Sequence, residues 1–293
     1  MSILKTLAYH DIFQYPLKAE EIRSYLISCR IKLPQLKRQI SVLIKAGKIE
    51  NHKDYYFLKG KKSTVATRIS RLENSKIKFK KARFYANILK LVGTIQMVAV
   101  SGALAMENSH KNDDIDLVIV TAKGTLWTTR LITMVLLSPF KRNPGSKSTD
   151  NRACLNLFFD ESDLNIKNQN IYQAHEICQM QPLWSRSKTY SRFIHVNKWI
   201  FNFLPNWTPI STVDLQFNNL TIIRLNDSKI SQRSTGLHTK IIELFAKKLQ
   251  LAYMRKKITT EKIGERQLFF HPKDTQGWVL DEYQKRLKEN KLL

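Results

Sequence analysis

Two apolar runs that stand close together most constrain how this chain can fold. They are IQMVAVS at residues 95–101 and DIDLVIVT at residues 114–121. Each has the length and the β-branched content of a buried strand and is too short for a core helix. The segment between them begins with Gly102, where the chain can turn, and has room for one short helix, expected over Ala103–Asn108. The two runs therefore predict two strands joined through one short helix.

The segments that follow continue the alternation of strands and helices. ACLNLFF, residues 153–159, is predicted as a third strand, and helices are expected over residues 125–137 and 168–181. A loop rich in Pro, Gly and Ser, residues 138–152, precedes the third strand. The remainder of the chain, from residue 186, is expected to be mainly helical. This order predicts an α+β fold with a small mixed sheet.

The first 62 residues follow a different pattern, of three short helices and a hairpin. Apolar residues recur at helical spacing up to Gly47, a natural helix end, and Pro34 stands where the third helix can begin. Two short strands around a polar turn are expected over residues 48–60. This arrangement resembles a winged helix-turn-helix domain, which implies a hairpin tip with Lys53 near a phosphate backbone. The resemblance also implies that the third helix offers polar side chains to a major groove: Gln35, Lys37, Arg38, Gln39 and Ser41. Such domains serve equally as protein-docking or spacer modules.

A strongly basic helix is predicted directly after this region. Residues 59–90 contain eleven Lys or Arg and one acid, Glu73. Apolar residues at spacings of three, four or seven predict one continuous amphipathic helix, capped by Ser63 or Thr64 and ended by Gly93. A solvated helix usually mixes both signs of charge to gain i,i+4 pairs, so the uniformly basic face favours an anion-facing surface. The nucleic-acid contacts expected from this helix and from the N-terminal region are Lys37, Arg38, Lys53, Arg68, Arg71, Lys78 and Lys81.

Net charge supports the same class of partner. The 293 residues include 49 Lys and Arg against 24 Asp and Glu, a formal net charge of +25. A chain this basic is attracted to polyanions, of which nucleic acid is the commonest. An anionic membrane surface and a compositional bias toward Lys are the alternatives. The most apolar run, residues 131–140, is too short to span a bilayer, so no membrane partner is expected.

Cysteine usage bears on the compartment. Cys29, Cys154 and Cys178 lie far apart and form no CxxC pair, which is typical of reduced thiols in a cytosolic protein. Lys5 and His10 interrupt any N-terminal apolar segment of the kind that a secretion signal requires. We therefore expect a cytoplasmic protein.

Two aspartates at the start of the second strand give the clearest chemical signal. Alternate residues of a strand point to the same side, so Asp114 and Asp116 project together. Carboxylates this close repel each other unless a cation lies between them, and Mg²⁺ or Mn²⁺ is the natural hard cation for such oxygens. Gly102 lets a phosphate approach its amide, and the helix that begins at Ala103 points its first N–H groups to the same place. The pattern indicates a site for a triphosphate with metal ions, suited to in-line attack at a phosphoryl group.

Ser101-Gly102-Ala103, ten further residues and then Asp114-Ile115-Asp116-Leu117 resemble the signature of the DNA polymerase β-like nucleotidyltransferase superfamily. The motif covers about residues 95–121, and CLNLFFDESDL followed by YQAHEICQM resembles a bacterial branch of nucleotidyltransferase-domain proteins of unknown substrate. The resemblance implies metal-dependent transfer of NMP from an NTP to an acceptor, with pyrophosphate released. It implies that Asp114 and Asp116 are catalytic and bind Mg²⁺ or Mn²⁺. It also implies that Ser101, Gly102 and Ala103 bind the nucleotide.

The chain departs from the family's pattern at two positions. Ala103 stands where many members have Ser or Gly, so a hydroxyl group for the phosphates is lost unless Ser101 replaces it. The family also uses a third carboxylate on a later strand, as base or as metal ligand. The best-aligned position holds Asn156, whose carbonyl oxygen can bind a metal but which cannot act as a base. Asp160, just past the strand, is the alternative.

The sequence leaves three functions open. The first is a nucleotidyltransferase whose acceptor is a nucleic acid held by the basic elements. The second is a nucleic-acid-binding regulator in which the transferase fold is inactive or senses nucleotides, and the third is transfer to a small molecule or another protein. The expected organisation is a winged helix over residues 1–62, a basic connecting helix over 63–93, a nucleotidyltransferase domain over 94–185 and a helical C-terminal region over 186–293.

Overall fold

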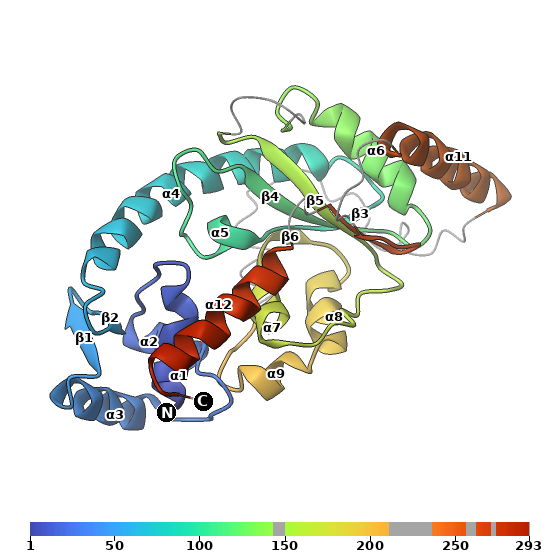
Figure 1. Ribbon diagram of the computed structural model, residues 1–293. Coiled ribbons are helices and arrows are strands. Elements are labelled where there is room, and N and C mark those ends of the chain that lie inside the picture. Colours follow the sequence, from blue (N-terminus) through green and yellow to red (C-terminus); the bar gives the residue numbers. More distant parts are fainter. Residues whose placement is uncertain (143–149, 211–235, 256–261, 271–273, 293) are drawn as a thin grey trace.

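A computed structural model describes residues 1–142, 150–210, 236–255, 262–270 and 274–292. It combines helices with a two-stranded and a six-stranded sheet, which confirms the expected mixture of helices and strands. Figure 1 shows the larger sheet near the middle of the molecule, the N-terminal helices to one side of it, and helices on both of its faces. Among the described residues, none of the helices combines the length and the apolar character needed to cross a membrane.

The N-terminal part has the expected order of three helices and a hairpin. In the hairpin, Lys53 and Asp54 form the turn with positive φ angles of 50° and 64°, the conformation that a two-residue hairpin turn favours. Pro34 lies in the first turn of the third helix, as predicted. The elements are α1 (Ser2–Asp11), α2 (Ala19–Ser24), α3 (Leu33–Lys45), β1 (Ile49–His52) and β2 (Tyr55–Leu58).

The predicted basic helix is one continuous element of 27 residues, α4 (Ser63–Leu89). Its buried side differs from the predicted apolar stripe, because Ile69 is exposed and the buried positions include Arg68, Arg71, Ser75 and Lys78. These four residues recur at spacings of three and four, so they form one polar seam along the inner face of the helix. The seam replaces part of the apolar packing that the sequence predicted.

The larger sheet has the strand order β6-β3-β4-β5-β8-β7, in which only β4 and β5 are parallel. The sequence predicted three of these strands: β3 (Ile95–Val100), β4 (Ile115–Thr121) and β5 (Ala153–Asp160). The other three correct that expectation: β6 (Gln181–Ser185), β7 (Lys262–Ile263) and β8 (Gln267–Phe269). β6 contains Pro182, which cannot donate a backbone hydrogen bond and is tolerated because this strand lies at the sheet's edge. The C-terminal region is therefore mainly helical but also completes the sheet.

Helices cover the two faces of this sheet differently. On one face, Val98, Leu117 and Phe158 share a core with side chains of α4, α6 and α11. On the other face, Val118 and Phe159 share a core with α7, α8 and the N-terminal helices. The remaining helices are α5 (Gly102–Ala105), α6 (Leu126–Leu136), α7 (Ile171–Gln179), α8 (Thr189–Val196), α9 (Ile200–Phe203), α11 (Leu237–Met254) and α12 (Thr275–Glu289).

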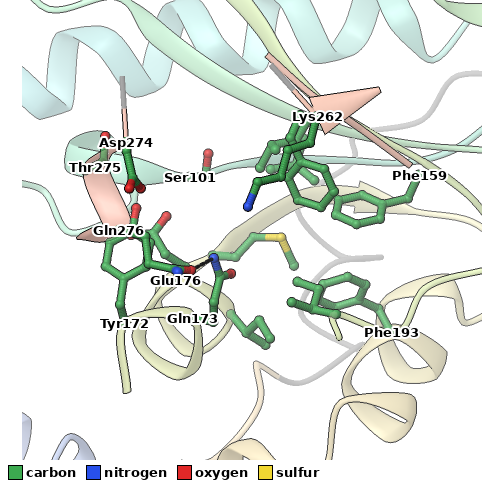
Figure 2. Close-up of a pocket in the computed structure, with 16 residues that line it drawn as sticks. Ser101, Phe159, Tyr172, Gln173, Glu176, Phe193, Lys262, Asp274, Thr275 and Gln276 are labelled. Carbon is green, nitrogen blue, oxygen red and sulfur yellow. Dashed lines mark hydrogen bonds between the residues drawn. The ribbon is translucent and has the colours of Figure 1, made fainter. Parts of the chain in front are cut away.

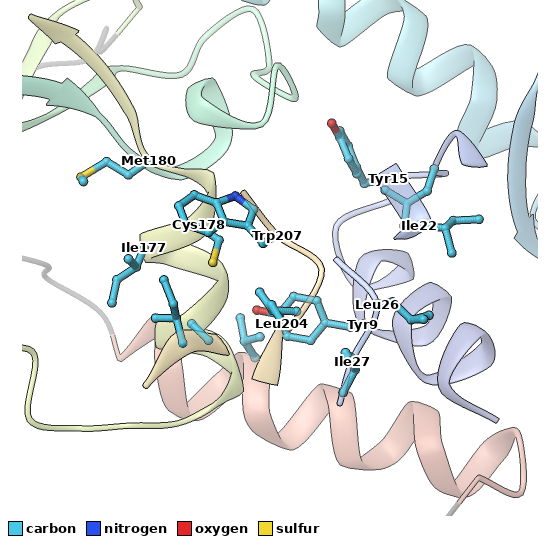
Figure 3. Packing of buried hydrophobic residues seen from close by; sticks show 14 of the residues in the cluster. Tyr9, Tyr15, Ile22, Leu26, Ile27, Ile177, Cys178, Met180, Leu204 and Trp207 are labelled. Atoms are coloured by element: carbon cyan, nitrogen blue, oxygen red, sulfur yellow. The ribbon is translucent and has the colours of Figure 1, made fainter. Parts of the chain in front are cut away.

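The N-terminal helices and α7 meet in a single hydrophobic cluster (Figure 3). Tyr9 of α1 stacks on His175 of α7, with ring centroids 4.0 Å apart and an interplanar angle of 12°. His10 lies edge-on to the same imidazole at 5.1 Å. Burial lowers the pKa of His10 to about 4 and also lowers the pKa of His175, so both rings are neutral and serve as packing groups at neutral pH.

Candidate functional site

The predicted aspartate pair lies at the start of β4, on one face of the sheet. Asp114 immediately precedes the strand and Asp116 is its second residue, and both side chains are half-buried. The backbone N–H of Ser101, at the end of β3, donates to the carbonyl oxygen of Asp116 over 3.1 Å. This bond joins the predicted phosphate-binding turn to the acidic strand, so the two parts of the motif are adjacent in space.

The turn at Gly102 is as tight as the sequence predicts. Gly102 has a φ of +61°, and a Cβ added to it would lie 3.0 Å from Oδ2 of Asp116. Any larger residue would strain the backbone and press on that carboxylate. The helix that follows is shorter than the expected 103–108 segment: α5 is a single turn, Gly102–Ala105. Ser101 is buried, whereas Ala103 is exposed.

The electrostatics of the pair suit the binding of a cation. Burial, together with the neighbouring charges of Asp114 and Glu176, raises the pKa of Asp116 to about 8. Without a metal ion, Asp116 therefore holds a proton at neutral pH. The other carboxylate is paired, because Nη1 of Arg142 lies 2.8 Å from Oδ2 of Asp114. The arrangement allows one proton and one guanidinium to balance two carboxylates.

Of the two candidates for a third ligand, only Asn156 lies at the pair. Its amide Nδ2 donates to Oδ1 of Asp116, and its own Oδ1 accepts from the thiol of Cys154 over 2.9 Å. The register between β4 and β5 shifts next to Asn156, since Leu117 pairs with Leu155 but Val118 pairs with Leu157. This bulge turns Asn156 toward the face that holds Asp116.

Asp160 does not belong to the site, which corrects the alternative that the sequence left open. It pairs with Thr121 at the opposite end of β4, five residues along the strand from Asp116, or roughly 16 Å. Its carboxylate accepts hydrogen bonds from the backbone N–H groups of Gly124, at 2.6 Å, and Ser162, at 2.9 Å. The role of Asp160 is therefore to fix the loops at that end of the sheet.

Cys154 is the remaining group close to the aspartates. One ligand atom each of Asp114, Asp116 and Cys154 lie within 4.8 Å of one another. Burial raises the pKa of the Cys154 thiol, as do the charges of Asp116 and Asp114, so sulfur remains protonated here. A protonated thiol is a poor ligand for a hard cation. The oxygen atoms of the two aspartates are therefore the better metal donors in this cluster.

A cavity of about 450 Å³ opens beside the aspartates on the same face of the sheet. Ser101 and Val118 line it, and Val118 follows Asp116 by two residues, so the cavity adjoins the acidic pair. Figure 2 shows Gln173 and Glu176 reaching toward it from α7, with Phe159 and Phe193 on another wall. No pattern in the sequence marked these cavity-lining residues of α7 as part of a site.

The structure corrects three of the expected nucleic-acid contacts. Arg68, Arg71 and Lys78 are buried, with only 5%, 8% and 1% of their surface exposed. Arg68 pairs with Glu21 at 2.6 Å, and Arg71 donates to the carbonyl oxygen of Phe13 at 2.8 Å. Charges that are already paired and withdrawn from solvent cannot contact a phosphate backbone.

Lys78 has a different partner, the loop that leads into β4. Its Nζ donates to the carbonyl oxygens of Lys111, at 2.9 Å, and Asp113, at 2.6 Å. Ser75 supports the same loop by accepting from the N–H of Ser109 at 3.1 Å. The polar seam of α4 thus positions the segment just before Asp114.

The other expected contacts remain at the surface. Lys37, Arg38, Lys53 and Lys81 are all exposed, as are the other polar residues predicted for the outer face of α3, which are Gln35, Gln39 and Ser41. No protein-family model, no curated protein and no solved structure matches this chain. The chemistry of the site must therefore be judged from its own geometry.

Proposed function

We propose that this protein is a nucleotidyltransferase that moves NMP from an NTP to an acceptor in the presence of Mg²⁺ or Mn²⁺. The observation that carries the proposal is the contact between the two halves of the motif: Gly102 approaches Asp116 so closely that a Cβ would lie 3.0 Å from its carboxylate. At Gly102 the backbone has no side chain and lies beside the two carboxylates. This arrangement suits a phosphate chain that a divalent cation bridges to Asp114 and Asp116.

The residues fit such a cation. Asp114 and Asp116 supply oxygen donors on one face, and Asn156 could offer its carbonyl oxygen if its amide turned about the Cβ–Cγ axis. The metal would neutralise the charge that develops on the α-phosphate and on the leaving pyrophosphate. Asp116 would lose its proton as it takes up the metal, and Asp114 would exchange its bond with Arg142 for one to the cation. Arg142 would then be free to contact a phosphate.

In this proposal Ser101 and Gly102 hold the triphosphate. Gly102 gives the backbone N–H groups of the turn access to phosphate oxygens, and Ser101 offers the hydroxyl that Ala103 lacks. Lys78 does not contact the nucleotide in this proposal. It positions the loop before Asp114 through its hydrogen bonds to the carbonyl oxygens of Lys111 and Asp113. The protein therefore contributes to catalysis by holding two carboxylates and a phosphate-binding turn in a fixed position relative to each other.

The experiment incubates the protein with α-labelled ATP, CTP, GTP or UTP, Mg²⁺ or Mn²⁺, and bulk RNA. We expect metal-dependent release of pyrophosphate together with labelled product. The variant Asp114→Ala/Asp116→Ala should release none, whereas the exposed control Asp281→Ala should match the wild type. Absence of nucleotide turnover in the wild type, or equal turnover in the double variant, would refute the proposal.

A second candidate is a nucleic-acid-binding regulator with a winged helix-turn-helix at residues 1–62. The observation that favours it is the row of exposed polar side chains on α3, together with the exposed Lys53 at the hairpin tip. A salt titration of DNA and RNA binding tests this candidate. Affinity should fall steeply with salt in the wild type and should be lower in Lys37→Ala/Arg38→Ala. A flat salt response would contradict phosphate contacts.

A further inference from the structure

The strands that carry the motif do not place a proton acceptor beside the aspartates at either of the two positions expected for a third carboxylate. Asn156 occupies the third-strand position next to Asp116, and an amide cannot act as a base. Asp160 is held at the other end of the sheet by Gly124 and Ser162. A base would therefore have to come from an element outside the strands that the sequence motif covers.

Two carboxylates line the cavity from such elements, Glu176 and Asp274, and Asp274 already caps α12 by accepting from the N–H of Gly277 at 3.0 Å. Glu176 is the better candidate. It lies on α7 and lines the cavity together with Ser101 and Val118. Its charge is close enough to Asp116 to raise the pKa of that carboxyl. Within the described part of the chain, the Glu176 side chain has neither a hydrogen bond nor an ion pair. Burial raises its pKa to about 7. The side chain is half-buried and borders the cavity, so its carboxyl is open to a group that binds there.

The cavity has the size and lining of a small-molecule site. Its volume of about 450 Å³ falls within the range of roughly 300–1,000 Å³ that is typical of ligand pockets. It is lined by side chains of the sheet, of α7 and α8, and of the start of α12.

The lining also indicates the chemistry of the molecule. Phe159 stands at the centre of an aromatic wall, with ring centroids 5.8 Å from Phe193 and 5.6 Å from Phe269. On another side, Nε2 of Gln173 donates to Oε1 of Gln276 over 3.0 Å, which leaves each amide a further polar atom for a ligand. An aromatic wall that faces amides and a carboxyl group suits a compound with an apolar ring face and several hydroxyl groups.

We propose that the cavity binds a small polyhydroxyl acceptor and that Glu176 is the general base that deprotonates its hydroxyl group. This inference rests on the proposed nucleotidyltransferase function. The acceptor oxygen forms a bond to the α-phosphorus of the NTP, and the bond from that phosphorus to the oxygen bridging to the β-phosphate breaks. Pyrophosphate leaves with the electron pair, and the hydroxyl proton passes to the Glu176 carboxylate and then to water.

The test compares Glu176→Gln with the wild type in two measurements. Pyrophosphate release is measured with each of the four α-labelled NTPs and Mg²⁺, with D-glucose, glycerol, water alone or bulk RNA as the acceptor probe. NTP binding is measured separately by equilibrium dialysis with Mg²⁺. We expect kcat to fall about 100-fold or more, because a positioned base contributes roughly 10²–10⁴-fold, while the Kd for the NTP stays within twofold. Glu176→Asp should recover part of the rate, and the exposed control Glu73→Gln should behave like the wild type.

The outcomes separate this inference from the function on which it rests. Equal kcat in Glu176→Gln and the wild type overturns the role of Glu176. Label that enters RNA but none of the small hydroxyl probes or water overturns the acceptor class. A wild type that binds no NTP and releases no pyrophosphate refutes the transferase itself, and the inference with it.

Discussion

Replacing Asp116 by Asn should stabilise the metal-free protein, and the gain should depend on pH. Burial and the charges of Asp114 and Glu176 raise the pKa of Asp116 from the ordinary value of 3.8 to about 8. Between these two values the folded state binds more protons than the unfolded state, so the free energy of unfolding falls as pH rises. Asn resembles the protonated acid and can still accept the hydrogen bond from Asn156.

The magnitude follows from the same change in pKa. A tenfold change in proton affinity corresponds to about 1.4 kcal/mol. The change in pKa from 3.8 to about 8 therefore limits the gain in the free energy of unfolding above pH 8 to about 6 kcal/mol. The pairing of Arg142 with Asp114 and the entry of water when the site ionises reduce this figure. We expect Asp116→Asn to gain on the order of 2 kcal/mol at pH 8, which raises the Tm by roughly 4–8 °C. At pH 4 the difference should vanish.

The assay is thermal unfolding in buffers without divalent metal, from pH 4 to pH 8, with Asp281→Asn as an exposed matched control. Added Mg²⁺ and NTP should then raise the Tm of the wild type, in which the metal displaces the proton of Asp116. The Tm of Asp116→Asn should not rise, because an amide cannot become the negatively charged oxygen ligand that the metal requires. If Asp116→Asn is less stable than the wild type at pH 8, or if the difference does not vary with pH, the folded protein does not raise the pKa of Asp116 as described.

Three further predictions follow from the contacts around the site. Lys78→Met should lower the free energy of unfolding by about 2–4 kcal/mol, because the loop before β4 loses the two hydrogen bonds that the buried ammonium donates to the carbonyl oxygens of Lys111 and Asp113. The exposed Lys81→Met should change the free energy of unfolding by less than about 0.5 kcal/mol in the same denaturant titration. Gly102→Ala should cost about 1–2 kcal/mol for its left-handed φ and should reduce Mg²⁺-dependent NTP binding, measured by equilibrium dialysis, because its Cβ presses on Asp116; unchanged binding would contradict the proposed phosphate contact. Asp160→Asn should lower the Tm but leave the Kd for Mg²⁺–NTP unchanged, and a loss of affinity without a loss of stability would return Asp160 to the site.

The local parts of the site could be predicted from the sequence because they depend on neighbouring residues. Asp114 and Asp116 share a face through the two-residue period of a strand, and Gly102 marks a turn that needs a positive φ. Arg142 and Glu176 could not be found in this way. They reach the site from a loop and from a helix on another part of the chain, and no short-range pattern encodes that contact.

Helices were easier to locate than to orient. The apolar spacing predicts the start of α4 near Ser63, although the helix ends at Leu89, short of the expected end at Gly93. It does not predict the burial of Arg68, Arg71 and Lys78, whose charges are satisfied by backbone carbonyls and Glu21. Their spacing of three and seven was the available signal, since it places all three on one side of the helix. Short strands such as β8 were missed because three residues are too few to show a period.

Ile241, Leu244, Phe245, Leu249 and Ala252 recur at helical spacing and predict an amphipathic helix in the C-terminal region. The helix is present as α11, but these residues do not form its buried side. Ile241 and Phe245, expected inside, are 57% and 68% exposed, whereas Ala246 and Gln250 are buried. Gln250 is held by bonds to Trp127 and Arg130 of α6. Periodicity identifies an amphipathic helix, but the partner decides which side it buries.

We propose that Asp114 and Asp116 hold a divalent cation bound to a triphosphate. Equilibrium dialysis of labelled NTP with and without Mg²⁺ tests it most directly, in the wild type and in Asp114→Ala/Asp116→Ala. We predict saturable binding that requires Mg²⁺ in the wild type and is lost in the double variant while its fold is retained. Binding of equal affinity in both proteins, or no Mg²⁺-dependent binding of any of the four NTPs by the wild type, would contradict the claim.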